Sequence, residues 1–475
     1  MKNSKSRLTF GLALASAALT FSLAVCAPAQ TVSFIYDFHA SGQQSSALSV
    51  IQGTDGNLYG TAGGGAYSQG RVFQLTTTGK LTTIYSFCSQ PNCADGEGQE
   101  PTPILGSDGN LYGVATFGGN ATGSGTFYRL TLDGRFTTLY TFCSAAGCAD
   151  GQWPHGFIQG WDGNFYGTTE SGGANNSGVL YQLSPSGGFK VLYSFCSLPK
   201  CIDGGTSSIM QGIDGKFYGT AGTGTLGGGY LYQITPDGSF SMLYNFCLYT
   251  DANCNSGSYP SPIVQDAKGN FFGTTPYGGV NGGGTVFEIT PKYLFHMLHG
   301  FGVFNQASDP IFGVTLANDG NLYGTSADYG YDGGRLFEVT PKGVYTELYF
   351  FQPGIGGYDP FWAPPFQGTD GLLYGTTLYD SGTCCYGTIF SLSNGISPLV
   401  ETVPTGGKAG QRVLILGNGL TGSTSVKFNG VAAKFTVESD TYIKAAVPLG
   451  ATTGTVSVVT PSGTLKSNPQ FVVTK

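Results

Sequence analysis

The sequence predicts an all-β protein, and three features carry that prediction. The chain has 78 Gly and 23 Pro among its 475 residues, and together these exceed the roughly 12% that the two residues make up in an average protein. Both residues disfavour long helices. Aromatic residues make up 13% of the chain and charged residues only 10%, so the composition is not that of a disordered chain. The third feature is a motif that recurs seven times.

The repeated motif is Asp-Gly-Asn-Leu-Tyr-Gly and its variants, with a period of about 52 residues. Two further motifs, Leu-Tyr-x-Phe and Val-Phe-x-Leu, keep the same period and alternate apolar with polar residues, as strands do. Asp-Gly predicts a tight hairpin whose two central residues have positive φ. Each unit is therefore expected to form four short antiparallel strands. The aromatic residues before the last glycine are Tyr59, Tyr112, Tyr166, Tyr218, Phe272, Tyr323 and Tyr374.

One four-stranded sheet cannot bury both of its faces, but seven sheets arranged radially bury one another. We therefore predict a seven-bladed β-propeller over residues 30–395. A linear solenoid is the alternative, but its ends would need atypical capping units. The last unit ends with a strand over 388–392 and lacks an outer strand. The strand over 33–38 is expected to supply it and to close the ring without an exposed edge.

The repeat stops after residue 395, and residues 396–475 contain neither Cys nor His. Alternation of apolar and polar residues continues there, and Asn429-Gly430 predicts a hairpin. About seven short strands in this length predict a small immunoglobulin-like β-sandwich.

Residues 1–29 have the pattern of a secretory signal peptide. Lys2, Lys5 and Arg7 precede an uncharged apolar run over 8–25, and Ala27-Pro28-Ala29 is a cleavage site. An uncleaved anchor and a lipid-modified Cys26 are the alternatives. We expect an extracellular or cell-surface location, and no transmembrane span once the signal is removed. A net charge of −7 without a basic cluster argues against a nucleic-acid partner.

Cysteine spacing agrees with export. Three pairs have the spacing C-x4-C and a fourth is slightly longer, which predicts local disulfides in an oxidising compartment. Zinc is the alternative, but no His accompanies any pair. The redox state of the adjacent Cys384 and Cys385 is left open. The predicted disulfides are Cys88–Cys93, Cys143–Cys148, Cys196–Cys201 and Cys247–Cys254.

The long loops of all seven units are expected at one end of the sheets, and binding sites usually lie on such loops. Several of these loops carry aromatic residues and few charges, which suits a carbohydrate or a surface protein as partner. Simple packing of the rings against the loops is the alternative. The candidate binding residues are Phe117, Trp153, His155, Tyr277, Tyr329, Trp362 and Tyr379, with Trp153, His155 and Trp362 placed in the loops between units.

No catalytic residue, metal site or cofactor is predicted, and the sequence leans against an enzyme. The alternative function is a polysaccharide-degrading propeller, a glycoside hydrolase or lyase, whose carboxylates would come from the loops. The carboxylates in question are Glu170, Asp328, Asp332 and Asp380. Five units also carry a glutamine near the end of the innermost strand, which either bonds to neighbouring backbone or water or lines a wet channel. These glutamines are Gln52, Gln159, Gln211, Gln265 and Gln367, with Leu105 and Leu316 in the other two units.

The seven units resemble the extracellular tandem-repeat family called GloVer repeats, found in secreted bacterial proteins. The matching text includes Asp-Gly-Asn-Leu-Tyr-Gly-Thr, the Gly-Gly loops and Thr-Val-Phe-Glu-Ile-Thr-Pro at 285–291. The family has no established activity, so the resemblance implies no catalytic residue. Residues 396–475 resemble an IPT/TIG immunoglobulin-like domain, with cues at 404–407, 413–417 and 426–430. That likeness implies a spacer or interaction module.

Overall fold

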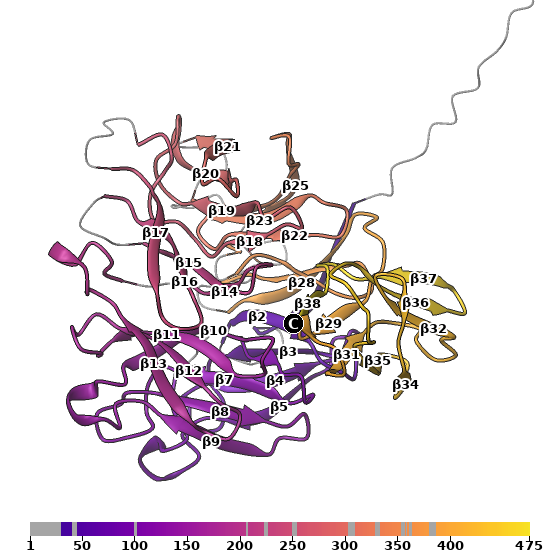
Figure 1. Ribbon diagram of the computed structural model, residues 1–475, viewed down its shortest axis with the longest axis horizontal. Helices are drawn as coiled ribbons and strands as arrows, with labels where there is room; N and C mark the ends of the chain where they lie inside the picture. Colours follow the sequence, from indigo (N-terminus) through magenta and orange to yellow (C-terminus); the bar gives the residue numbers. More distant parts are fainter. Residues whose placement is uncertain are drawn as a thin grey trace, which may run out of the picture.

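The computed structural model describes residues 30–39, 45–98, 102–205, 208–222, 227–248, 254–302, 309–327, 333–352, 357, 359–360, 363–379 and 386–475. The all-β prediction is confirmed. Over these ranges the only helices are three single turns, η1 (Pro91–Cys93), η2 (Ala146–Cys148) and η3 (Pro199–Cys201). Blade-like, four-stranded antiparallel sheets succeed one another along the chain, each passing to the next through a long loop (Figure 1).

Within the described ranges, seven of these sheets cover residues 31–393. The first contains β2 (Ala47–Gln52), β3 (Leu58–Ala62), β4 (Arg71–Leu75) and β5 (Leu81–Ser86), and the second contains β6 (Ile104–Leu105), β7 (Leu111–Ala115), β8 (Thr126–Leu130) and β9 (Phe136–Thr141). The third contains β10 (Gln152–Gln159), β11 (Phe165–Ser171), β12 (Val179–Leu183) and β13 (Phe189–Ser194), and the fourth contains β14 (Met210–Gln211), β15 (Phe217–Ala221), β16 (Tyr230–Ile234) and β17 (Phe240–Asn245).

The fifth sheet contains β18 (Val264–Gln265), β19 (Phe271–Thr275), β20 (Gly282–Ile289) and β21 (Phe295–Gly302), and the sixth contains β22 (Val314–Leu316), β23 (Leu322–Ala327), β24 (Gly334–Val339) and β25 (Tyr345–Phe351). The seventh contains β26 (Phe366–Gln367), β27 (Leu373–Thr376), β28 (Thr388–Ser393) and, as its fourth strand, β1 (Thr31–Asp37). Strand β1 runs antiparallel to β28, with Ser33 opposite Ser391. The outer strand of the last sheet thus comes from the beginning of the chain.

The hydrophobic core lies between consecutive sheets. Tyr59 and Phe87 of the first sheet pack with Tyr128 of the second, and Phe301 of the fifth packs with Phe337 of the sixth. The same kind of cluster joins the first sheet to the seventh, where Phe73 shares a core with Ile389. The strands that carry these residues are too short to bury their apolar faces alone, so each sheet is stabilised by its neighbours.

The glutamines of the innermost strands link neighbouring sheets through hydrogen bonds. The Oε1 atom of Gln159 accepts a hydrogen bond from the backbone N–H of Ser107 in the preceding sheet, at 2.8 Å, and Gln211 does the same with Trp161, at 3.0 Å. Gln52 of the first sheet accepts in the same way from Thr369 of the seventh, at 3.0 Å. The expected bonding to neighbouring backbone is therefore observed. Corresponding bonds are made by Gln265 with Ile213 and by Gln367 with Asn318.

The prediction that Asp-Gly forms a turn with two residues of positive φ is wrong. In the turn between β2 and β3 only Gly56 has positive φ, at 80°, and the N–H of Gly53 donates to the carbonyl of Asn57 across a three-residue loop. Such loops need a single left-handed residue at the glycine. Asp55 instead accepts hydrogen bonds from the backbone N–H of Asn57, at 3.1 Å, and from the hydroxyl of Tyr59, at 2.8 Å.

The strands after residue 400 form a separate pair of facing sheets. One has the order β29 (Glu401–Val403), β31 (Arg412–Leu416), β35 (Tyr442–Ala446), β34 (Phe435–Val437), and the other has the order β33 (Val431–Ala432), β32 (Ser425–Phe428), β36 (Val456–Thr460), β37 (Gly463–Lys466). Strands β30 (Gly406–Lys408) and β38 (Val472–Thr474) pair with each other in parallel. Ile415 and Ile443 of the first sheet pack against Phe428 and Val458 of the second, which gives these strands a core of their own. We call them the C-terminal sheets (yellow in Figure 1).

Candidate functional site

Each of the seven sheets presents two different ends. Tight turns between the first and second strands, such as 53–57, and between the third and fourth, such as 76–80, lie at one end, which we call the turn end. The loops between the second and third strands and those that lead to the next sheet lie at the other, the long-loop end. Five of the predicted binding residues, Phe117, Trp153, His155, Tyr277 and Tyr379, belong to this end, whereas Tyr329 and Trp362 lie outside the described residues.

The placement of Trp153 and His155 in a loop is wrong. Both lie in β10, which begins at Gln152, and Glu170, also expected in a loop, lies in β11. These two strands run further toward the long-loop end than their counterparts in the second sheet, with Pro154 opposite Thr169. The backbone of Trp153 has a φ of 59° and donates its N–H to the carbonyl of Ser124 in the preceding sheet, at 2.9 Å.

On this extended hairpin the side chains form a small polar group beside Trp153. The Nε2 atom of His155 lies 3.2 Å from Oε2 of Glu170, and both side chains are exposed to solvent, by 38% and 61%. Gln152 donates a hydrogen bond to the hydroxyl of Ser171 at 3.3 Å. An exposed imidazole–carboxylate pair can donate and accept hydrogen bonds to a polar ligand at this end of the sheet.

A second aromatic group lies on the fifth sheet. The rings of Tyr259 and Tyr277 meet edge to face, with centroids 5.8 Å apart, and they are 50% and 46% exposed. Tyr259 was missed by the sequence analysis. It occupies the position of Trp153, since each has a φ of 59°, precedes a proline and donates its N–H to the preceding sheet. The repeated aromatic–Pro dipeptide was the signal that could have found it.

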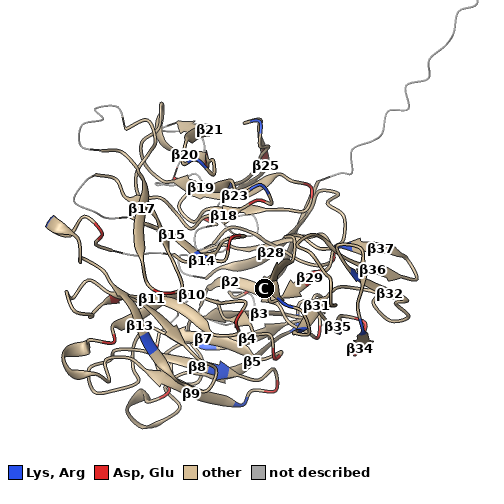
Figure 2. Cartoon of the chain, in the orientation of Figure 1, with Lys and Arg blue, Asp and Glu red and all other residues tan. Residues whose placement is uncertain are grey.

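Exposed aromatic residues are confined to the long-loop end. Over the described ranges four aromatic side chains are exposed, and all four lie in long loops, whereas the exposed large side chains in the tight turns are aliphatic, such as Leu294 and Val344. Charged residues are sparse across the sheets (Figure 2). The exposed aromatic residues are Tyr67, Phe117, Tyr259 and Tyr277.

Disulfides and buried aspartates hold the long loops in place. All four cysteine pairs named above are joined by disulfides. In the loop that joins the second sheet to the third, Asp150 accepts hydrogen bonds from the N–H of Ser144, at 2.9 Å, and the hydroxyl of Tyr140, at 2.6 Å. Burial and this bond to Asp150 raise the pKa of Tyr140 above its ordinary value. Asp95 and Asp203 make the same contacts in their own loops, so each of these three loops is held both by a disulfide and by hydrogen bonds to a buried aspartate.

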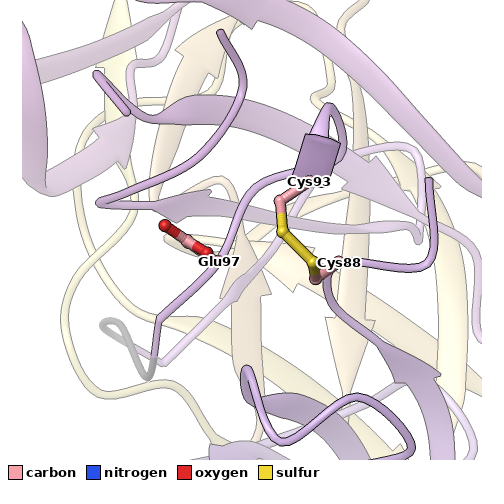
Figure 3. A group of neighbouring side chains, drawn as sticks. All are labelled: Cys88, Cys93 and Glu97. Atoms are coloured by element: carbon pink, nitrogen blue, oxygen red, sulfur yellow. A yellow bond between two sulfur atoms is a disulfide. The ribbon is translucent and has the colours of Figure 1, made fainter. Parts of the chain in front are cut away.

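Within the part of the chain that the structure describes, one group of side chains has the composition of a metal site, namely Cys88, Cys93 and Glu97 (Figure 3). The two sulfur atoms are bonded to each other. Zinc is bound by thiolates, which a disulfide does not provide. The group is therefore a structural disulfide of this loop with a glutamate beside it. Of the carboxylates considered for hydrolysis, Glu170 pairs with His155, and Asp328, Asp332 and Asp380 lie outside the described residues.

The C-terminal sheets contact the turn end of the seven sheets. The indole N–H of Trp161 donates to the hydroxyl of Thr405 at 3.3 Å, and the hydroxyl of Thr441 donates to the carbonyl of Thr54 at 2.6 Å. Asn468 donates to the carbonyl of Leu316 at 3.1 Å. These bonds fall on the third, first and sixth sheets, so the C-terminal sheets span several of them and lie at the end opposite the exposed aromatic residues.

Comparison with protein-family models gives one match, described as the Gloeobacter/Verrucomicrobia repeat, over residues 16–221 and 204–437. The two matched segments together cover most of the chain. The chain belongs to the Gloeobacter/Verrucomicrobia repeat family. The two matched segments include the seven repeated sheets, and the second segment extends into the C-terminal sheets. No curated protein matches this family member.

Solved structures resemble the chain only distantly. A protein of unknown function from Bacteroides thetaiotaomicron VPI-5482 is 14% identical, with 77% of this chain and 76% of that chain covered and a TM-score of 0.42. Puromycin hydrolase is 12% identical, with 71% and 60% covered and a TM-score of 0.39. A calcium-binding protein, regucalcin, from Agrobacterium tumefaciens str. C58 is 12% identical, with 62% and 92% covered and a TM-score of 0.36. These likenesses carry no argument about activity. Within the described ranges, no helix has the length and apolar character to cross a membrane.

Proposed function

We propose that the chain is a secreted, non-catalytic binding protein that holds a carbohydrate against the long-loop end of a seven-bladed β-propeller. The observation that carries the proposal is that, among the described residues, the exposed aromatic side chains are confined to that end. Tyr259 lies in the loop that contains the Cys247–Cys254 disulfide, and the backbone of Phe117 pairs with that of Glu97, just after the Cys88–Cys93 disulfide. Aromatic faces with few charges nearby suit sugar rings, and rigid loops lower the entropic cost of binding. The C-terminal sheets occupy the opposite end, so the long-loop end is the one left for a partner.

Closure of the seven sheets into a ring is part of this proposal. Support comes from the contact between the first and seventh sheets, which we call a seam. It has the same glutamine hydrogen bond and the same kind of shared hydrophobic core as the contacts between sheets that follow one another in the chain. Gln52 bonds to Thr369 as Gln159 bonds to Ser107, and Phe73 shares a core with Ile389. Strand β1 pairs with the edge of β28, so the seventh sheet has four strands like the other six. In such a ring the long loops of all seven sheets surround one axis.

Residues 1–29 serve as a signal peptide in this account, and residues 396–475 as an IPT/TIG domain that links the propeller to its surroundings. The disulfides suit an oxidising, extracellular location or the cell surface. The facing sheets of the C-terminal segment, with their own core, suit an immunoglobulin-like module.

Two groups are expected to contact the carbohydrate. Tyr259 and Tyr277 provide a bent aromatic surface on the fifth sheet. Trp153, His155 and Glu170 provide a ring edge with hydrogen-bonding groups beside it on the third.

A glycan array followed by calorimetric titration with the best glycan tests the proposal. We expect Tyr277→Ala to weaken binding at least tenfold, because it removes one of the two exposed rings of the aromatic pair. Val344→Ala, which changes an exposed side chain in a tight turn, should leave the affinity unchanged. Absence of binding to any glycan, or equal affinity of the two variants, would contradict the proposal. Release of reducing ends that depends on Glu170 would favour the hydrolase instead.

A further inference from the structure

Two cavities of about 340 and 400 Å³ lie between the C-terminal sheets and the innermost strands of the seven sheets. Their walls are mainly apolar, and every one of the seven innermost strands contributes to them. Volumes of this size suit small ligands. The apolar side chains from these strands are Ile51, Ile104, Ile158, Met210, Val264, Leu316 and Phe366.

One carboxylate faces this apolar space. Glu401 in β29 lines both cavities, as do Thr405 and Phe366, so these residues lie where the cavities adjoin. Among the described residues that line either cavity, Glu401 is the one that can carry a charge. No residue in the described ranges forms a hydrogen bond or ion pair with its carboxylate. Burial raises the pKa of Glu401 from its ordinary value of 4.5 to about 7.

An ionised carboxylate among apolar side chains is costly unless a cation pairs with it. A calcium or magnesium ion needs about six oxygen ligands, whereas the cavity walls offer a single carboxylate. Five glutamines of the two cavity walls already use their Oε1 atoms to accept backbone N–H groups. An organic ammonium ion needs only one counter-ion, and its carbon chain gains from contact with the apolar wall. Trp161 and Phe366 add aromatic rings, which attract such cations.

We propose that these cavities form a binding site for a small organic cation, of the alkylammonium class, in which Glu401 is the counter-ion. The site lies beside the C-terminal sheets and is independent of the carbohydrate surface proposed for the long-loop end.

Calorimetric titration of the full secreted chain with n-butylammonium chloride at pH 8.5 tests this site. Glu401 is ionised at that pH, and because it is the one counter-ion we expect saturable binding of one ion per chain. Butanol, which has the same carbon chain and no charge, should bind at least tenfold more weakly, and sodium chloride should give no saturable signal. Lowering the pH to 5.5 protonates Glu401 and should weaken butylammonium binding at least tenfold.

Glu401→Gln keeps the shape and removes the charge, and it is expected to fold because it relieves an unpaired carboxylate. This variant should bind butylammonium at least tenfold more weakly. The matched control is Glu438→Gln, which changes a glutamate of the C-terminal sheets that pairs with Lys444 outside the cavities. It should bind as the unmodified chain does. No saturable binding to the unmodified chain, or the same affinity in Glu401→Gln, would overturn the proposal.

Discussion

Replacement of Gln52 by leucine is expected to weaken the seam between the first and seventh sheets. Gln52 is 7% exposed and Thr369 is fully buried, and the bond between them spans the two ends of the repeated region. Leucine has a similar size but accepts no hydrogen bond, so the N–H of Thr369 would be left buried without a partner. An unsatisfied buried donor costs about 1–3 kcal/mol, and we expect a loss of about 2 kcal/mol in the free energy of unfolding.

Urea unfolding of the secreted chain measures this loss, and hydrogen exchange locates it. A change of about 2 kcal/mol corresponds to roughly 30-fold faster exchange at Thr369 if the amide exchanges by opening of the seam. Gln90→Leu, at an exposed position in a disulfide loop, is the control and should change the free energy by less than about 0.5 kcal/mol. Unchanged stability in Gln52→Leu, with unchanged exchange at Thr369, would refute the reasoning.

Three further predictions concern single sites. Because folding raises the pKa of Glu401 to about 7, the folded chain holds this proton more tightly than the unfolded chain, and the free energy of unfolding should fall by about 3 kcal/mol between pH 4.5 and 7.5. Urea unfolding of Glu401→Gln should lack this fall. Asp266→Gly, Lys268→Asp and Phe272→Tyr together should stabilise the chain by about 1 kcal/mol in urea unfolding, because they restore the aspartate–tyrosine hydrogen bond of the other six sheets and remove the carboxylate that now bonds to Asn270. Equal stability of this variant and the parent chain would contradict a stabilising role for that bond. Cys143→Ser with Cys148→Ser should cost about 2 kcal/mol, because the loop that the disulfide closes is short, and a thermal scan that matches the parent would contradict the estimate.

The repeat was predictable from the sequence because strands alternate with period 2 and the chain repeats each motif in phase. The role of the repeated aspartate was only half predictable. Its place in a turn was expected, but its bond to the tyrosine four residues later was not. A signal for that bond existed, since the fifth unit loses both partners together, as Lys268 and Phe272.

Contacts between distant segments were not predictable, because alternation shows which face of a strand is buried but not which residues cover that face. Trp153 was placed in a loop because the repeated motifs do not show that β10 begins earlier than the corresponding strands of the other units. The position of Glu401 in a cavity depends on how the C-terminal sheets meet the turn end, more than 200 residues from Trp161 in the chain. Its sequence context, a strand that begins after Val400, resembles that of any exposed glutamate.

The most direct test of ring closure is a designed disulfide between β1 and β28. Ser33→Cys and Ser391→Cys replace residues that face each other across the two strands. Under mild oxidation, peptide mass spectrometry of the monomeric chain should find the two new cysteines linked, whereas Ser33→Cys with Ser241→Cys, on β17 of the fourth sheet, should form no link. Absence of the 33–391 link, or its formation only between two molecules, would contradict a ring that the chain closes with its own first strand.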